Sequence, residues 1–206
     1  MALASENEGK LQEPWKRSGK TGISERKVDR FIPVLGLLGA FVVVGLTLGW
    51  YGSDLQGIDV ATRTSARFSA FVFAGALAMR LTPRGTVWMR AFVVAHVVHY
   101  ATVFYQAVTD VHTRMHVLNA GHCALIIYGV LLLLPLVFAS PNSTTVGRRL
   151  NAVAVFLVWA TFAGGAAFNA AVYRTALIPL IPLLAGLTMH VCRSVQRFQW
   201  RTDILG

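Results

Sequence analysis

The sequence predicts an all-α polytopic membrane protein, a bundle of six transmembrane helices with the N and C termini in the cytoplasm. The chain of 206 residues is 55% hydrophobic and only 14% charged, whereas a soluble domain usually carries about 25% charged residues. Six apolar segments approach the roughly 20 residues that a helix needs to cross the hydrocarbon core. The density of lysine and arginine alternates between these segments, and this alternation fixes the orientation of the bundle.

The six expected spans, in chain order, are residues 31–50, 68–79, 91–108, 117–139, 151–169 and 175–192. The second segment is short and crosses the membrane when residues 66–81 are included, with Arg67 and Arg80 extending to the two surfaces. We keep it because an odd number of spans would spoil the charge asymmetry. The chain then divides into a polar basic cytoplasmic tail (1–30), a six-helix transmembrane domain (31–193) and a short cytoplasmic tail (194–206).

Fifteen of the 19 lysines and arginines fall on one side of the expected bundle. The other four are Arg63, Arg67, Arg114 and Arg174. The positive-inside rule therefore places both termini in the cytoplasm, and we expect an integral protein of the bacterial inner (plasma) membrane. The net charge of +10 then reflects topology and contact with anionic lipid headgroups. Because no nucleic-acid motif accompanies the charge, we expect the lipid bilayer as a partner and no nucleic acid.

The first 30 residues mix Gly, Ser, Lys and Glu and contain no apolar run of the kind found in a signal peptide. Such a composition predicts a disordered cytoplasmic tail. The alternative is a docking arm for a partner, with Trp15 as an anchor beside Lys16 and Arg17.

Proline and asparagine predict tight cytoplasmic turns at residues 82–85 and 140–143. The longest outer loop is expected at residues 51–65. No loop is long enough for a catalytic domain, so we expect no catalytic residues there. Any chemistry must take place within the membrane or on a partner chain.

Small residues and prolines predict how the expected helices pack. Ala70, Ala74 and Ala78 repeat every four residues, and Gly164 and Gly165 are adjacent, which favours close helix contacts within one bundle over a dimer seam. The last span contains two prolines, and each lacks a backbone donor, so a kink is expected there. The prolines are Pro179 and Pro182.

Two histidines in the third span are the best functional clue. His96 and His99 are three residues apart and therefore share one helix face. At about 1.5 Å per residue they lie roughly 9 and 13 Å beyond Arg90, near mid-membrane. Ionisable residues at this depth point to a functional site, and histidine is a common axial ligand of haem iron. The alternative is a neutral pair that hydrogen-bonds to neighbouring helices.

Three motifs in order resemble the ferric reductase-like transmembrane family. They are the run at residues 64–73, the third span with Phe92, His96 and His99, and the run at 147–150 that leads into a helix with Trp159 and Phe162. The resemblance covers about half of the chain. It implies a six-helix bundle that binds b-type haem between two histidine-bearing helices and passes electrons across the membrane or to a partner. On that resemblance His99 is the shared haem ligand, and His96 is the extra histidine of the HxxH variant.

The chain departs from the family pattern at Asn151, where the family has its second haem histidine directly after the Arg-Arg-Leu run. Either another histidine replaces the lost one, or the haem is absent and the bundle is a structural subunit. His190, at the inner end of the last span, is the expected substitute. Its alternative role is that of an interfacial residue touching headgroups.

The remaining histidines and the two cysteines predict no further site. His112, His116 and His122 cluster near the outer surface without a suitable carboxylate or thiolate, so we expect no metal site. Cys123 and Cys192 lie at opposite depths, which argues against a disulfide. The resemblance to the ferric reductase-like family thus implies a membrane redox subunit that carries haem b and works with a soluble redox partner or other membrane subunits. The alternative is a haem-free structural or assembly subunit of a larger complex, and whether the chain is an enzyme stays open.

Overall fold

The computed structural model describes residues 22–82, 84–109, 129, 131, 133, 134, 136, 144–170 and 174–205. Within these residues the chain forms five α-helices and one short 3-10 helix, and no strand. The elements are α1 (Gly22–Tyr51), α2 (Leu55–Met79), α3 (Gly85–Thr109), α6 (Thr145–Ala170), the 3-10 helix η2 (Arg174–Leu177) and α7 (Leu180–Leu205). Residues 129, 131, 133, 134 and 136 are also helical. The predicted all-α class is therefore confirmed for the described part of the chain.

Three of the helices are long and apolar enough to cross a membrane, namely Asp29–Tyr51 of α1, the whole of α3, and Thr145–Ala167 of α6. These segments match the first, third and fifth expected spans. α2 has the same length as α3, but its first half carries charged residues. Most of the fourth expected span, at 117–139, lies outside the described residues, so the number of six spans stays a prediction.

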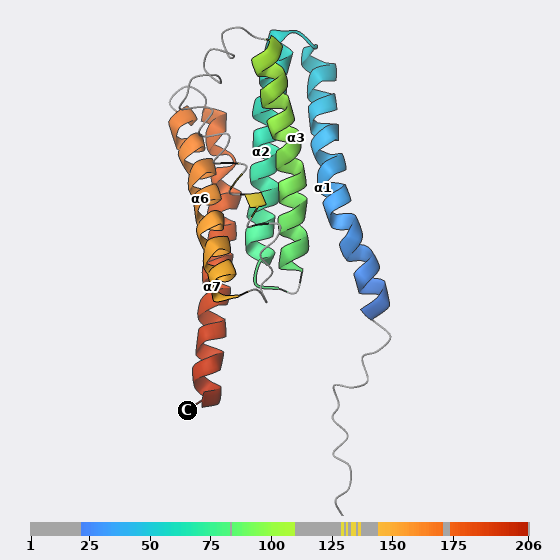
Figure 1. Ribbon diagram of the computed structural model, residues 1–206. Helices are drawn as coiled ribbons and strands as arrows, with labels where there is room; N and C mark the ends of the chain where they lie inside the picture. The colour runs from blue at the N-terminus through green and yellow to red at the C-terminus, as the bar shows by residue number, and fades with distance from the viewer. Residues whose placement is uncertain are drawn as a thin grey trace, which may run out of the picture.

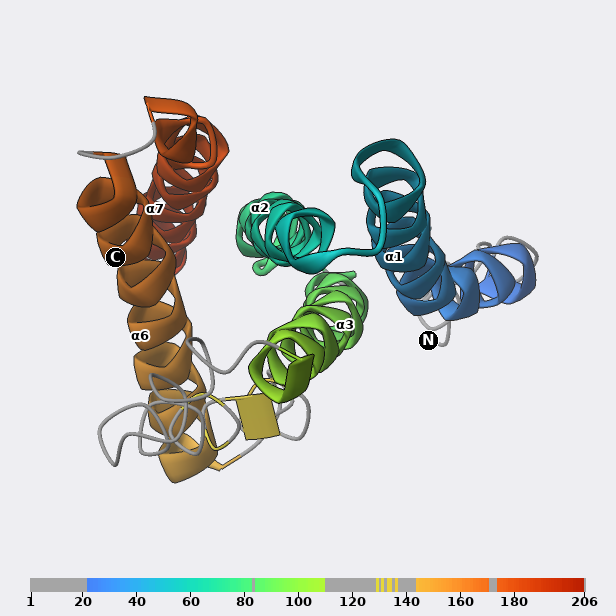
Figure 2. The same cartoon turned by 90° about the horizontal axis from the view of Figure 1, so that it is seen from above.

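The helices run side by side along one axis, and α2 occupies the centre. Seen from above, α2 lies between α1 and α3 on one side and α6 and α7 on the other (Figure 2). It contacts α1, α3 and α7. The start of α1 and the end of α7 lie at the same end of the bundle (Figure 1). That end also carries the turn between α2 and α3 (Figure 1).

The core lies where α2, α3 and α7 meet. Phe73 and Leu77 of α2, Phe92 of α3 and Leu183 of α7 are fully buried there. The rings of Phe73 and Phe92 lie with their centroids 4.8 Å apart in a tilted arrangement. Because bulky rings cannot slide past one another, this contact fixes the register between α2 and α3.

Small residues allow α2 and α7 to approach closely, as the sequence predicts. Ala70 and Ala74 of α2 are buried, and a Cβ added to Gly186 of α7 would lie 2.6 Å from the carbonyl oxygen of Ala74. This part of the alanine repeat therefore packs within the bundle. An added Cβ on Gly164 or Gly165 of α6 would meet nothing within 4 Å, so the expected close contact at these two glycines is not present among the described residues.

The outer connection between the first two helices is much shorter than expected. The polar residues at 51–65 predict a loop, but α1 continues to Tyr51 and α2 already begins at Leu55. Gly52 adopts a φ of 89°, which glycine reaches without strain. The Asp54 side chain accepts a hydrogen bond from the Gly57 amide at 2.8 Å and so caps α2. The cap explains why a polar sequence is helical here.

The turn between α2 and α3 is tight, as predicted. The amide of Thr82 donates to the carbonyl of Met79 at 2.9 Å, and the amide of Gly85 donates to the carbonyl of Thr82 at 3.0 Å. Arg84 in this turn forms an ion pair with Asp29 of α1, with 3.2 Å between Nε and Oδ1. The turn therefore ties the start of α1 to the α2–α3 hairpin.

The prolines of the last span mark a helix start instead of a kink within a helix, which corrects the prediction. Pro179 lies in the turn between η2 and α7, and Pro182 lies in the first turn of α7. The first amides of a helix have no partner within the helix, so proline loses no hydrogen bond at this position. The Leu183 amide donates to the carbonyl of Pro179 at 3.2 Å and closes that first turn.

Two helices extend into the segments expected to be tails. α1 begins at Gly22, inside the expected tail of residues 1–30, and α7 continues to Leu205. Cys192 on α7 is a free, exposed cysteine. Several predictions fall outside the described residues: the anchor Trp15, the turn at 140–143, the outer histidines His112, His116 and His122, and Cys123.

Candidate functional site

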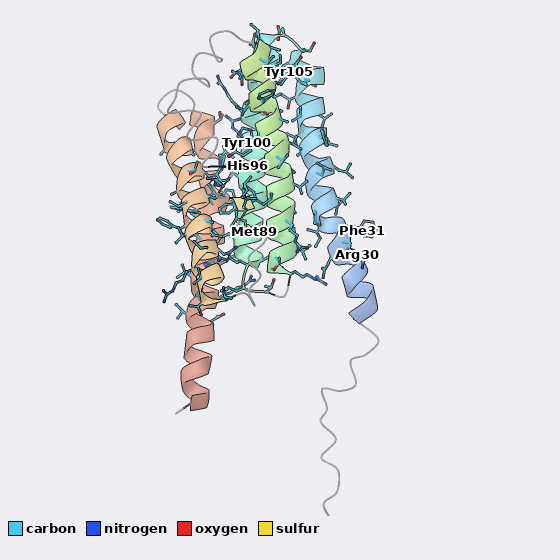
Figure 3. The ribbon with its side chains drawn as sticks, viewed as in Figure 1. Arg30, Phe31, Met89, His96, Tyr100 and Tyr105 are labelled. Carbon is cyan, nitrogen blue, oxygen red and sulfur yellow. The ribbon has the colours of Figure 1, made fainter. Side chains whose placement is uncertain are left out.

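A cavity of about 330 Å³ lies between α2, α3, α6 and the segment that precedes α7. This volume is at the lower end of the range of about 300–1,000 Å³ that is usual for ligand sites. Its described lining residues are Arg63, Ala66, Arg67, Ala70, His96, His99, Tyr100, Thr161, Phe162, Gly165, Ala166 and Pro179. Both histidines of the third expected span therefore face one cavity, as their spacing predicts. Figure 3 shows His96 and Tyr100 near the middle of α3.

Two hydroxyl groups contact His99: that of Ser65 contacts the ring, and that of Thr102 contacts the backbone carbonyl. Nδ1 of the ring lies 3.0 Å from Oγ of Ser65. Ser65 donates its proton to the carbonyl of Thr62 at 2.8 Å, and Thr102 donates its own to the carbonyl of His99 at 2.7 Å. A hydroxyl has a single proton, and if Ser65 and Thr102 direct theirs to these carbonyls, Nδ1 of His99 is the donor to Ser65. We assign the proton of the neutral ring to Nδ1 on this basis, which leaves Nε2 with a free electron pair.

His96 is placed by ring contacts. Its ring lies 5.3 Å from that of Phe92, 5.3 Å from that of His99 and 5.4 Å from that of Phe162, measured between centroids. The Tyr100 ring is closer still, at 4.6 Å. The Nδ1 atom of His96 is buried and has no hydrogen-bond partner among the described residues. A buried polar atom without a partner carries a desolvation cost, so the placement of His96 rests on its ring contacts.

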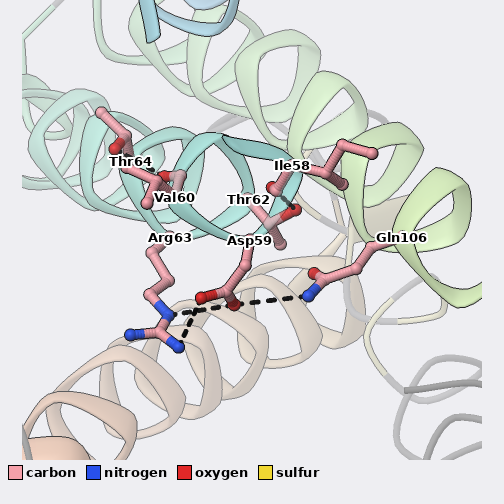
Figure 4. Close-up of polar contacts among 7 residues, drawn as sticks. All are labelled: Ile58, Asp59, Val60, Thr62, Arg63, Thr64 and Gln106. Carbon is pink, nitrogen blue, oxygen red and sulfur yellow. Dashed lines mark hydrogen bonds and ion pairs between the residues drawn. The ribbon is translucent and has the colours of Figure 1, made fainter. Parts of the chain in front are cut away.

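The two arginines of the cavity differ in how their charge is compensated. Arg63 pairs with Asp59 one turn earlier on α2, at 2.6 Å between NH2 and Oδ2. Asp59 also accepts a hydrogen bond from Gln106 of α3 at 3.3 Å (Figure 4). Arg67 instead donates from NH2 to the hydroxyl of Thr175 on η2 at 2.9 Å. Among the described residues no acidic side chain forms a salt bridge with Arg67.

His190 is not among the described residues that line the cavity. It lies eleven residues after Pro179, and this separation is about 16 Å along α7. Three residues further on, Arg193 donates to the carbonyl of Ala78, near the end of α2. The structure therefore brings His96 and His99 together and leaves His190 near the end of the bundle that carries the termini.

Asn151 is also distant from the cavity. Its Oδ1 accepts a hydrogen bond from NH2 of Arg80, the C-cap residue of α2, at 2.5 Å. On α6 it lies eleven residues before Phe162, which contacts His96, and this separation is again about 16 Å. In this structure Asn151 is a partner for a half-buried arginine.

The donor atoms of the cavity fit one axial ligand of a haem iron. With Nδ1 of His99 protonated and bonded to Ser65, its Nε2 has the electron pair that an iron ligand needs, and such a partner on the far nitrogen is usual for ligating histidines. His96 and His99 sit side by side on one helix, so they cannot lie on opposite faces of one porphyrin. No second histidine, cysteine or methionine from another helix is present among the described lining residues. A bis-histidine arrangement is therefore not supported by these residues.

Sequence reasoning missed Ser65 and Thr102 as partners of His99. A signal for the α2 face exists, because Thr62, Ser65 and Ser69 repeat at spacings of three and four residues, which is typical of a helix face that packs. The sequence alone does not say which residue of α3 that face meets. Arg67 was noted as part of the 64–73 run, but its place in the cavity wall was not expected.

Comparison of the chain with protein-family models, with curated proteins and with solved structures found no match. The site must therefore be interpreted from its own geometry.

Proposed function

We propose that this chain is an integral membrane redox subunit of the ferric reductase-like type. It carries a b haem and passes electrons to or from a partner, and it resides in the bacterial inner membrane. The sequence motifs described above are the basis for the family. Three helices that are long and apolar enough to cross a membrane support the location.

One observation carries the redox proposal. His99 lines the cavity with its Nδ1 engaged by Ser65 at 3.0 Å, so Nε2 is the atom that would hold an iron. The aromatic side chains of Phe162 and Tyr100 lie in the same wall. When bound, a haem supplies one-electron chemistry. The chain supplies the ligand atom, its fixed orientation and an apolar wall that excludes water.

The second candidate is a haem-free structural or assembly subunit of a larger membrane complex. A specific observation favours it: Asn151, at the position of the family's second histidine, is a hydrogen-bond partner of Arg80. The absence of a second axial ligand among the described lining residues points the same way. In that case the two histidines contribute to helix packing, or the cavity binds a ligand other than haem.

An absorption spectrum of the purified full-length chain separates the two candidates. We expect a reduced-minus-oxidised difference spectrum with the bands of b-type haem after expression with added haem precursor. His99→Ala should remove these bands. His190→Ala is the matched control and should keep them, because His190 is not part of the described cavity wall.

One result would contradict the redox proposal, and another would contradict the choice of ligand. Wild-type protein that is folded but lacks b-type absorbance favours the structural subunit. A spectrum that survives in His99→Ala excludes His99 as the ligand.

A further inference from the structure

Two arginines line the cavity, and only one of them forms a salt bridge with an acidic residue among the described residues. Arg63 is paired with Asp59, whereas Arg67 donates a hydrogen bond to a neutral hydroxyl, that of Thr175. A guanidinium stays charged at any physiological pH. Arg67 is half-buried in the cavity wall, and a guanidinium in this position presents its donors to an anionic ligand.

The rest of the described wall is largely apolar. Ala66 and Ala70 from α2, Phe162 and Ala166 from α6, and Pro179 surround the space beside Arg67. Gly165 lies in the same wall, and an added Cβ there would meet nothing within 4 Å, so α6 leaves room along this side. A ligand that fills the cavity must therefore present mainly apolar surface.

We propose that Arg67 binds the carboxylate of a ligand whose remaining body is apolar. The single uncompensated charge matches one carboxylate group, and the planar guanidinium offers paired donors that fit the two oxygens of that group. Thr175 adds a hydroxyl beside the guanidinium. The body of the ligand then lies against the side chains of Phe162 and His96, which line the same cavity.

This inference deepens the proposed function, because it names the chemistry of a ligand for the same cavity, but it does not require haem. Two sources supply this chemistry. One is the side-chain carboxylate of a porphyrin, and the other is a fatty acid from the bilayer. Both molecules have a carboxylate at the edge of an apolar body, so Arg67 could bind either of them in the same way.

Binding of matched acids and esters to the full-length chain in lipid nanodiscs tests the proposal. The first pair of probes is zinc protoporphyrin IX and its dimethyl ester, followed by porphyrin fluorescence. The second pair is palmitic acid and methyl palmitate, followed by calorimetry. At least one free acid should bind roughly 10- to 100-fold more tightly than its ester, the factor expected for a hydrogen bond to a charged group.

Variants assign this preference to Arg67. Arg67→Gln should lower the affinity for the acid to that for the ester, and Arg67→Lys should keep part of the preference, because it keeps the charge and loses the planar pair of donors. Arg149→Gln is the matched control: Arg149 is an exposed arginine on α6 near the opposite end of the bundle, and the preference should be unchanged.

The outcomes separate this inference from the haem proposal. A preference for palmitic acid that Arg67→Gln abolishes, without porphyrin binding, supports the inference and counts against haem. Porphyrin binding with equal affinity for acid and ester, without a preference for palmitic acid over methyl palmitate, overturns the inference and leaves the haem proposal intact. Failure of both acids to bind overturns the inference. If Arg67→Gln does not fold, the ratio of acid to ester affinity in the wild-type protein still decides.

Discussion

Ser65 and Ser69 lie one turn apart on α2, and both are fully buried. Ser65 touches His99, Thr62 and Thr102 through its hydroxyl. The Ser69 hydroxyl has no hydrogen-bond partner among the described residues. The same side chain on one helix face therefore stabilises the structure at one position and carries a desolvation cost at the other.

We expect Ser65→Ala to lower the free energy of unfolding by about 1–3 kcal/mol, because it leaves Nδ1 of His99 without its partner. Ser69→Ala is the control and should be neutral or slightly stabilising, because it removes an unpaired hydroxyl. Unfolding in detergent, followed by circular dichroism, measures both. Equal destabilisation by the two changes would show that the Ser65–His99 bond contributes little.

The Arg80–Asn151 hydrogen bond gives a second prediction at this scale. Asn151→Ala should destabilise the protein by about 1–3 kcal/mol, because a half-buried cation loses a partner. Asn151→Asp should keep the stability of the wild-type protein, since a carboxylate accepts the same hydrogen bond from Arg80 with added charge attraction. Thermal unfolding of the three proteins tests this. Equal stability of the Ala and Asp variants would contradict a role for the contact.

The structure shows how far residue patterns reach. Spacing alone predicts that His96 and His99 share a helix face, because they are three positions apart, and both line the cavity. The Ser65–His99 bond depends on the register between α2 and α3, which the tilted ring contact of Phe73 and Phe92 helps to set. A sequence does not state such a register. The haem role of His99 stays a prediction.

At the scale of elements, the packing of α2 against α7 depends on the absence of a single side chain. The Cβ atom of a Gly186→Ala variant would lie 2.6 Å from the carbonyl oxygen of Ala74. This distance is shorter than van der Waals contact, so the two helices would have to move apart. We expect a loss of about 1–3 kcal/mol, typical of overpacking. Gly164→Ala on α6 is the control, with nothing within 4 Å, and should be neutral or stabilising by up to about 1 kcal/mol through helix propensity. Equal effects of the two substitutions on the unfolding midpoint would count against this close approach.

Helix boundaries were the least predictable part of the elements. The segment at 51–65 reads as a loop because it is polar, yet Asp54 caps α2 and extends the helix through it. Pro179 and Pro182 read as a kink, yet they stand where α7 begins. At Asp54 a local hydrogen bond outweighs the polarity of the segment. At the two prolines the missing backbone donor costs nothing, because the first amides of a helix have no partner within the helix.

At the scale of the whole molecule, the surface of α1 matches the proposed membrane location. Large apolar side chains are exposed along it, among them Leu35, Phe41, Leu46 and Trp50. Such a surface is typical of contact with lipid or with another membrane helix. The start of α1 and the end of α7 lie at one end of the bundle (Figure 1), an arrangement that agrees with termini on the same side of a membrane.

The excess of basic residues predicts that this side is the cytoplasm. A fluorescent reporter that folds only in the cytoplasm should be active when fused after Gly206, and alkaline phosphatase, which needs the periplasm, should be inactive there. The same pair fused before Met1 should give the same result. A periplasmic signal at either end would refute the six-span topology.

α2, the central helix, combines extensive burial with charged residues, and this has a consequence for biogenesis. Its first half carries Asp59, Arg63 and Arg67, and a charged side chain opposes translocon insertion by an amount that reaches about 2.5–3.5 kcal/mol at the membrane centre and is smaller towards the surface. The neighbours that offset this cost are α1 and α3, both apolar enough to enter alone. Under the proposed topology α2 is expected to integrate only together with α3. A glycosylation-site insertion assay should find α2 translocated when it is presented by itself and integrated when α3 follows it, and efficient insertion of the isolated helix would show that it needs no such help.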